Sequence, residues 1–320
     1  MKNNMGFLKL VKFSIFILLI YYIYYKVPWQ EVNDVIFSAS IDMLILAIIL
    51  QIISFLTISV RWWMIIRYER EVDLKSTLKI SYIGIIFNHF MPSSIGGDFV
   101  RGYYISKIGV SLTKAIQSLI IDRVLGLFFL LIFSLVFLII YRNIISLPSY
   151  IENTVALSLF AVFMLISIAK SSWIVAVNNF RFVKSFFSAA NHEKITLTIS
   201  KFQKNIPSTI VILGMFLMSF ILFFAEISVF WLIALSLDIN YPFYIFVIAV
   251  PIITIIAALP ISFGGLIMRE AAGIVILEMM GVTVAEASLI VILFIPILVI
   301  SSLPGVYLYL KSDRVVKSTI

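Results

Sequence analysis

The 320-residue sequence contains no cysteine and only two histidines, His89 and His192. Without cysteine the chain forms no disulfide and no thiolate metal site, and two histidines alone argue against a histidine-built metal centre. Charged residues are also scarce, at 12% of the chain against about a quarter in soluble domains. The sequence lacks a glycine-rich nucleotide loop, a zinc motif and a nucleophile elbow. We therefore expect no cofactor, and nothing in the sequence demands an enzyme.

Apolar residues are in excess, since 62% of the chain is hydrophobic and 15% is aromatic. This composition predicts an all-α, polytopic integral membrane protein in which residues 1–320 form a single membrane domain. The first apolar segment is flanked by Lys9, Lys12 and Lys26 and lacks a small-residue cleavage site, so we interpret it as a retained helix. Apolar runs predict six full spans, at residues 13–25, 43–60, 113–141, 154–169, 207–237 and 287–310.

One signature occurs twice in the chain. Residues 92–101 read PSSIGGDFVR and residues 260–269 read PISFGGLIMR, so both fit the pattern P-x-S-x-G-G-x-x-x-R. Each segment follows an apolar run and precedes a helical stretch that ends in Gly-Val-Ser/Thr, at residues 109–111 and 281–283. Proline ends a helix, and paired glycines permit backbone angles that are closed to other residues. Interruptions at corresponding places in two halves are typical of a membrane transport site.

We interpret each signature as the turn of a Pro-Gly-Gly re-entrant hairpin that does not cross the membrane. Span–hairpin–span then occurs twice, as a first repeat over about 43–141 and a second over about 207–310, joined by a helix at about 154–169. Six full spans give these inverted repeats opposite orientations and place the hairpins face to face near the midplane. The alternative is eight full spans, in which each pair of half-helices is tilted enough to cross.

Lysine and arginine set the orientation, because cytoplasmic segments are enriched in them. They gather at both termini, in the polar stretch 170–206, and after the second span, where Arg61 begins the basic segment. The opposite side carries only Lys26 and Arg142, among five acidic residues. This asymmetry predicts a multi-pass protein of the plasma or inner membrane with both termini in the cytoplasm. We interpret Trp62 and Trp63, which follow Arg61, as interfacial anchors.

Arg101 and Arg269 occupy the same place, four residues after the second glycine of their motifs. That place is the first turn or so of a returning half-helix, where free N–H groups and a partial positive charge favour anions. The motifs therefore predict a receptor for an anionic lipid headgroup. Besides the two arginines, the receptor comprises Ser94, Gly96, Gly97, Ser262, Gly264 and Gly265. In the alternative, serine and glycine only permit close packing, and each arginine pairs with a neighbouring acid, Asp98 or Glu270.

Three further charges lie inside long apolar spans. Asp122 and Arg123 are adjacent, so on a helix their side chains point about 100° apart and each needs its own partner. We place Arg123 among the predicted headgroup residues, with a lipid phosphate or a hairpin carboxylate as its partner, and a structural ion pair is the alternative. Glu226 is either a proton-coupling site or a structural partner of Arg269 or Arg123, and the structural interpretation is favoured.

Three ordered motifs resemble those of one known family. They are Asn88-x-x-x-Pro92-Ser93-x-x-Gly96-Gly97-Asp98-x-x-Arg101, Asp122-Arg123-Val124-Leu125-Gly126 and Leu259-Pro260-Ile261-Ser262-x-Gly264-Gly265-x-x-x-Arg269-Glu270-Ala271. Across essentially the whole chain, the sequence is similar to the lysylphosphatidylglycerol synthase transmembrane-region family. The resemblance implies a flippase-like membrane module, which in some relatives is fused to a soluble aminoacyl-transferase domain. Because the sequence ends at Ile320 without such a domain, we expect no lysyl transfer by this chain itself.

The sequence thus favours a transporter or lipid-binding module that binds and translocates an anionic phospholipid or a polyprenyl-phosphate-linked lipid. The alternative is a membrane enzyme or accessory subunit in phospholipid aminoacylation or lipid-linked sugar assembly, acting with a separately encoded transferase. A third possibility is a non-transporting scaffold. The basic residues fall at the predicted membrane boundaries, which argues against nucleic acid as a partner.

Overall fold

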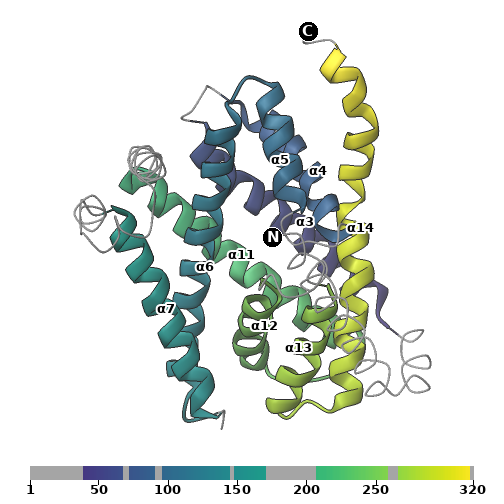
Figure 1. The fold of residues 1–320 in the computed structure, drawn as a ribbon. Coiled ribbons are helices and arrows are strands. Elements are labelled where there is room, and N and C mark those ends of the chain that lie inside the picture. Colours follow the sequence, from purple (N-terminus) through teal and green to yellow (C-terminus); the bar gives the residue numbers. More distant parts are fainter. Residues whose placement is uncertain are drawn as a thin grey trace, which may run out of the picture.

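The computed structural model describes residues 39–67, 72–90, 96–144, 148–170, 207–258 and 266–317, and every regular element in those ranges is an α-helix (Figure 1). Four of these helices are long and apolar enough to cross a membrane: α3 (Ile41–Ile66), α6 (Leu112–Tyr141), α11 (Thr209–Ser236) and α14 (Val284–Lys317). The shortest, α3, has 26 residues, and at about 1.5 Å per residue it exceeds the ~30 Å hydrocarbon core. The chain is therefore a multi-pass membrane protein.

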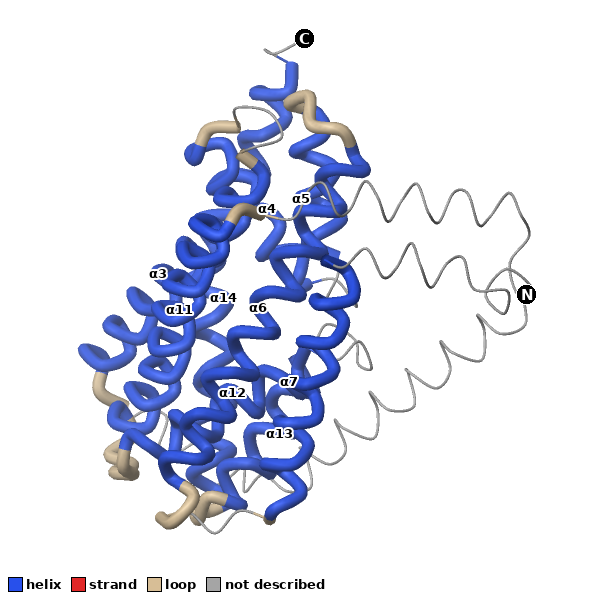
Figure 2. The backbone as a smooth tube through the Cα atoms, turned by 90° about the vertical axis from the view of Figure 1, so that its left-hand side faces the viewer, coloured by secondary structure: helices blue, strands red, loops and turns tan. Residues whose placement is uncertain are grey.

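Four shorter helices form two pairs. α4 (Leu74–Phe90) packs on α5 (Gly96–Lys107), and α12 (Phe243–Ala258) packs on α13 (Leu266–Met279). None exceeds 17 residues, so each is shorter than the hydrocarbon core is thick. Figures 1 and 2 place the α4–α5 pair toward one end of the molecule and the α12–α13 pair toward the other. A ninth described helix, α7 (Ser149–Lys170), packs on α6 at the edge of the bundle.

The contacts between helices follow a two-fold pattern. α3 and α11 pack along each other through the centre of the molecule. Around them, α4 packs on α14 and α12 packs on α6, so each short pair contacts the long helix that follows the other pair. Likewise α5 packs on α6 and α13 packs on α14. The helices α3 to α6 thus occupy places that match those of α11 to α14.

The two Gly-Val-Ser/Thr turns have the same geometry. Gly109 and Gly281 have backbone φ angles of 97° and 88°, which residues with a β-carbon rarely adopt. In both turns the following valine donates its N–H to the carbonyl five residues back, at 3.4 Å and 3.0 Å. The hydroxyls of Ser111 and Thr283 then cap the next helix by accepting from the N–H three residues on, at 3.4 Å and 3.3 Å. The repeated sequence therefore forms a repeated local structure.

The predicted boundary near Arg61 is wrong. α3 does not end at Val60 but continues through Ile66, and it carries Arg61 and Trp62 into the protein interior. Trp62 is fully buried and donates from its indole nitrogen to the hydroxyl of Ser118 at 3.0 Å, so it is not an interfacial anchor. The helix continues because the Arg61 charge is paired inside the bundle and does not need the membrane surface. Other predicted boundaries shift by a few residues, since α7 begins at Ser149 where the span was predicted from 154, and α14 runs to Lys317 where it was predicted to end at 310.

Candidate functional site

The contact between α4 and α5 requires glycine on both helices. A β-carbon on Gly97 would lie 2.0 Å from the carbonyl oxygen of Gly84, and one on Gly84 would lie 2.6 Å from Cγ of Arg101. Real side chains do not approach that closely, so only glycine permits this helix spacing. The close approach brings Asn88 of α4 to the start of α5, where its Oδ1 accepts the N–H of Gly97 at 2.7 Å. The backbone N–H of Gly97, which belongs to the predicted headgroup receptor, therefore already donates its hydrogen bond within the protein.

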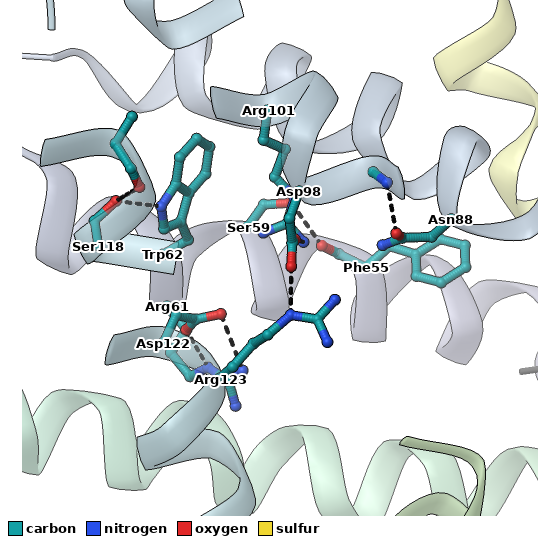
Figure 3. Close-up of polar contacts among 12 residues, drawn as sticks. Phe55, Ser59, Arg61, Trp62, Asn88, Asp98, Arg101, Ser118, Asp122 and Arg123 are labelled. Atoms are coloured by element: carbon teal, nitrogen blue, oxygen red, sulfur yellow. Dashed lines mark hydrogen bonds and ion pairs between the residues drawn. The ribbon is translucent and has the colours of Figure 1, made fainter. Parts of the chain in front are cut away.

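Asp98 lies between two arginines, with Arg101 on one side and Arg123 on the other (Figure 3). Its Oδ2 accepts a charge-assisted hydrogen bond from Nε of Arg123, which comes from α6, and its Oδ1 lies 3.7 Å from Nη2 of Arg101, three residues further along α5. The Arg101 side chain is buried, whereas 43% of the Arg123 side chain is exposed. One carboxylate thus ties α5 to α6 and leaves an excess of one positive charge in this cluster.

Asp122 has a different partner from its neighbour Arg123. Its two oxygens accept from Nε and Nη2 of Arg61 on α3, at 2.7 Å and 3.3 Å, and Nη1 of Arg61 donates to the Ser219 hydroxyl on α11 at 3.1 Å. Both charged side chains are buried. Gly126 lies one helical turn after Asp122, and a β-carbon there would fall 2.7 Å from the guanidinium. The Asp-Arg-Val-Leu-Gly motif therefore supplies both the counterion and the space for Arg61.

A cavity of about 220 Å³ is lined by residues from α3, α4 and α5 of the first half and from α11, α12, α13 and α14 of the second. Arg101 of α5 and Arg269 of α13, the two arginines from the matched motifs, both line it. The third charged residue on its wall is Glu226 of α11. The remaining polar lining comes from α3, α4 and α12, and consists of Gln51, Asn88 and Thr254.

Both cavity arginines stack on aromatic rings. The guanidinium carbon of Arg101 lies 5.4 Å from the centre of the Trp62 ring, and that of Arg269 lies 5.1 Å from the centre of the Phe294 ring. Stacking on a π-face stabilises a buried guanidinium while leaving its N–H groups free in the plane of the group. The two arginines are thus held in similar environments, although only Arg101 has an aspartate at the i−3 position.

Among the described residues, several buried polar atoms at or near the cavity have no hydrogen-bond partner. They include Nε of Arg101 and Oε1 of Gln51, whose residues are 5% and 2% exposed, and both carboxylate oxygens of Glu270. Leaving such a group unsatisfied costs about 1–3 kcal/mol, more when it is charged. Arg101 and Gln51 line the cavity, so a bound molecule would satisfy them, whereas Glu270 is not part of its lining. Unsatisfied groups on a cavity wall indicate a binding site.

The structure brings together some predicted residues and leaves others outside its description. Arg101, Arg269 and Glu226 share the cavity, while Arg123, Asp98 and Asp122 lie in the adjoining ion pairs. Neither of the predicted partners of Glu226 forms an ion pair with it in the described chain, although Arg269 and Arg61 attract it electrostatically. The predicted first span 13–25 and residues 171–206 of the polar stretch lie outside the described residues. So do four of the predicted headgroup residues, Ser94, Ser262, Gly264 and Gly265.

Sequence reasoning missed Gln51, Thr254 and the internal role of Arg61. The apolar run continues past Arg61 for five residues, Trp62 to Ile66, which is the signal that the helix does not end there. Asp122 also demands a cation from elsewhere, because its neighbour Arg123 points away from it on the helix, and Arg61 is that cation. Gln51 and Thr254 belong to no motif, so only the packing of α3 and α12 identifies them.

Comparison with known proteins gives two matches. The family model described as the lysylphosphatidylglycerol synthase TM region matches residues 9–305, which is nearly the whole chain. A UPF0104 membrane protein of Methanocaldococcus jannaschii is 28% identical over 109 residues. That match covers 32% of this chain and 32% of the archaeal protein, so the alignment spans only about a third of the relative's length.

Proposed function

Because the chain belongs to the lysylphosphatidylglycerol synthase transmembrane-region family, we propose that it binds the anionic headgroup of a membrane lipid in its central cavity and moves that headgroup between the leaflets. One observation carries the proposal: Arg101 and Arg269 hold the same place in two copies of one motif and line one cavity. Two positive charges inside a membrane bundle are costly unless an anion compensates them. The Arg101–Asp98 contact, at 3.7 Å, leaves Nε of Arg101 without a hydrogen bond to any described residue.

The chemistry of guanidinium suits a phosphate. A planar fork of N–H donors binds phosphate oxygens bidentately, and a charge-assisted bond of this kind is about twice as strong as a neutral one. Because Trp62 and Phe294 cover the arginine faces, the donors that remain lie in the guanidinium planes. A phosphate between Arg101 and Arg269 would satisfy the unpartnered Nε and balance the excess charge of the cavity.

The matched halves support the proposed movement between the leaflets. We regard α3–α6 and α11–α14 as inverted repeats, with the α4–α5 and α12–α13 pairs as re-entrant hairpins that start from opposite sides of a plasma or inner membrane. The exchanged helix contacts and the similar glycine turns support this view. In such an arrangement one half rocks against the other around a fixed central site, so the site opens to each side in turn. We orient the protein with both termini in the cytoplasm.

A leaflet-exchange assay tests the proposal. The full chain is reconstituted in vesicles that contain fluorescently labelled phosphatidylglycerol, and the outer-leaflet label is quenched at intervals. We expect the wild-type protein to expose inner-leaflet lipid, and Arg101→Ala or Arg269→Ala to abolish exchange with the protein still inserted. Arg→Lys should restore only part of the rate, because an ammonium lacks the bidentate fork. Full exchange by the double alanine variant would contradict the proposal.

A further inference from the structure

The cavity contains acceptors as well as donors, and a phosphate alone cannot satisfy them. Oε1 of Gln51 has no hydrogen-bond partner in the described part of the chain, and its residue is 2% exposed. Glu226 contributes a carboxylate to the same wall. An ionised phosphodiester has only acceptor oxygens, so it pairs with Arg101 and Arg269 but repels these two groups. The complete cavity is therefore complementary to a molecule that presents hydrogen-bond donors beside an anionic phosphate.

The volume agrees with a headgroup that is larger than phosphate. At about 30 Å³ for each water-sized group, the cavity of about 220 Å³ holds roughly seven such groups. A phosphate between the two arginines leaves room for several more heavy atoms. Those atoms would contact Gln51, Thr254 and Glu226, which come from three different helices.

Charge decides which kind of donor fits. The charged groups on the described wall are Arg101, Arg269 and Glu226, whose sum is one positive charge. The neighbouring pairs Arg61–Asp122 and Arg123–Asp98 are each neutral. Glu270, which follows Arg269 and does not line the cavity, is counted as uncharged because its burial penalises the carboxylate form. A hydroxylated phosphodiester carries one negative charge and brings the sum to zero. A headgroup with an added ammonium leaves at least one positive charge uncompensated, and such a charge is expensive inside a membrane.

We infer that the headgroup is a phosphodiester with one negative charge and free hydroxyls, of the polyol or glycosyl phosphate class, and that Gln51 and Glu226 read its hydroxyls. Arg101 and Arg269 hold the phosphate, while Oε1 of Gln51 and the Glu226 carboxylate accept from the hydroxyl groups. This inference rests on the proposed function and assigns Gln51 and Glu226 as specificity-determining residues. A site built to bond a hydroxyl discriminates strongly against an analogue that lacks it, because its own polar groups then stay unpaired.

Three lipids with identical acyl chains separate the possibilities. Phosphatidylglycerol has one negative charge and two hydroxyls, phosphatidylmethanol has the charge without a donor, and phosphatidylethanolamine adds an ammonium. Each lipid is titrated into the purified full chain in neutral detergent, and the bound fraction is measured by native mass spectrometry. We expect phosphatidylglycerol to bind about tenfold more tightly than phosphatidylmethanol and more tightly than phosphatidylethanolamine.

Single variants then test which residues distinguish phosphatidylglycerol from phosphatidylmethanol. Gln51→Met removes the unpartnered acceptor at similar volume, and it should weaken phosphatidylglycerol binding about tenfold while leaving phosphatidylmethanol binding unchanged. Ser54→Ala is the matched control, since Ser54 is equally buried on α3 but bonds to its own helix at 3.1 Å and does not line the cavity. Glu226→Ala removes a negative charge as well as an acceptor, so it should strengthen phosphatidylmethanol binding and narrow the preference for phosphatidylglycerol, as Gln51→Met narrows it. If Gln51→Met fails to fold, Glu226→Ala carries the same test.

The outcomes distinguish this inference from the proposed function. Equal binding of phosphatidylglycerol and phosphatidylmethanol by the wild-type chain would overturn the hydroxyl assignment but leave an anion site. Preference for phosphatidylethanolamine would show that Glu226 reads an amine, and it would also overturn the inference. If the wild-type chain binds neither anionic lipid more tightly than its Arg101→Ala variant does, the proposed function itself fails.

Discussion

Arg61 of α3 binds Asp122 of α6 through two hydrogen bonds, at 2.7 Å and 3.3 Å. The matching helices of the second half, α11 and α14, carry an aromatic pair instead. Counted from the matched helix caps Ser111 and Thr283, the residue equivalent to Asp122 is Phe294. Phe294 stacks on Phe230 of α11, the counterpart of α3, with ring centres 4.6 Å apart. The same junction is therefore ionic in one half and apolar in the other, although the surrounding helices match.

The first prediction concerns this ion pair. Asp122→Ala leaves the buried Arg61 charge uncompensated, and it should lower the free energy of unfolding by about 3–5 kcal/mol. Glu152→Ala is the control, because Glu152 pairs with the exposed Arg142 at 3.6 Å and such a surface pair contributes about 1 kcal/mol or less. Thermal unfolding of the purified variants measures both effects. Similar melting temperatures for the two variants would refute the structural role of the pair.

The apolar junction in the second half suggests a compensating variant. Replacing both partners, as Arg61→Met with Asp122→Leu, removes the buried charges together and should be more stable than Asp122→Ala alone. The reason is that well-packed apolar side chains avoid the cost of desolvating two ions. A double variant less stable than the single one would indicate that the pair has a geometry that apolar groups cannot replace.

The second prediction concerns the spacing of α4 and α5. Gly97→Ala places a methyl group 2.0 Å from a backbone oxygen, which cannot move without separating the helices, and it should cost at least about 1–3 kcal/mol. Gly102→Ala on the same helix is the matched control. A β-carbon there meets nothing closer than 3.8 Å, so the substitution should gain up to about 1 kcal/mol of helix propensity. Melting temperatures that fall for Gly97→Ala and hold or rise for Gly102→Ala are the expected result.

The third prediction concerns pH. Asp73 precedes α4, and its Oδ2 accepts the N–H of Ser76 at 3.0 Å. Hydrogen bonding to Ser76 holds the pKa of Asp73 below its ordinary value. The carboxylate therefore contributes stability that is fully present above the unfolded pKa of about 3.9 and is lost as the pH falls through the folded pKa. Asp73→Asn keeps a capping oxygen but does not titrate, so its melting temperature should fall less than that of wild type between pH 6 and pH 3. Equal falls would refute the contribution.

The fourth prediction concerns topology. Because the chain has no cysteine, single cysteines report position without a background. Lys79, Lys107, Asp238 and Gly281 are all exposed. Cysteines at Lys79 and Lys107 should react with a membrane-impermeant reagent only from the cytoplasm, and those at Asp238 and Gly281 only from outside. Labelling of Lys79 and Lys107 from opposite sides would mean that α4 and α5 cross the membrane, as in the eight-span alternative.

The sequence predicted the long helices well because length and apolarity define a membrane span. Predicted spans 43–60, 113–141, 207–237 and 287–310 correspond to α3, α6, α11 and α14. The family resemblance is confirmed by the match over residues 9–305. Helix ends were predicted less well, because a charge such as Arg61 is read as a boundary unless its partner is known. That partner lies 61 residues away, and no local pattern connects the two.

The cavity was predictable only in part. Repeated motifs single out Arg101 and Arg269, since a pattern that occurs twice is visible without a structure. The other polar residues of the wall are Gln51, Asn88, Glu226 and Thr254, and they come from four helices. Their convergence depends on how α3, α4, α11 and α12 pack. In the sequence, the only sign of such packing is a small residue such as Gly84 or Gly97. The sequence does not indicate which helix packs against it.

The central claim is that Arg101 and Arg269 hold one phosphate in one cavity, and a double-mutant cycle tests it most directly. Phosphatidylglycerol affinity is measured for the wild-type chain, Arg101→Ala, Arg269→Ala and the double variant. If both arginines bind the same phosphate, the losses are coupled, and the double variant should bind only slightly more weakly than either single variant. Losses in binding free energy that simply add, as for two independent sites, would contradict the account.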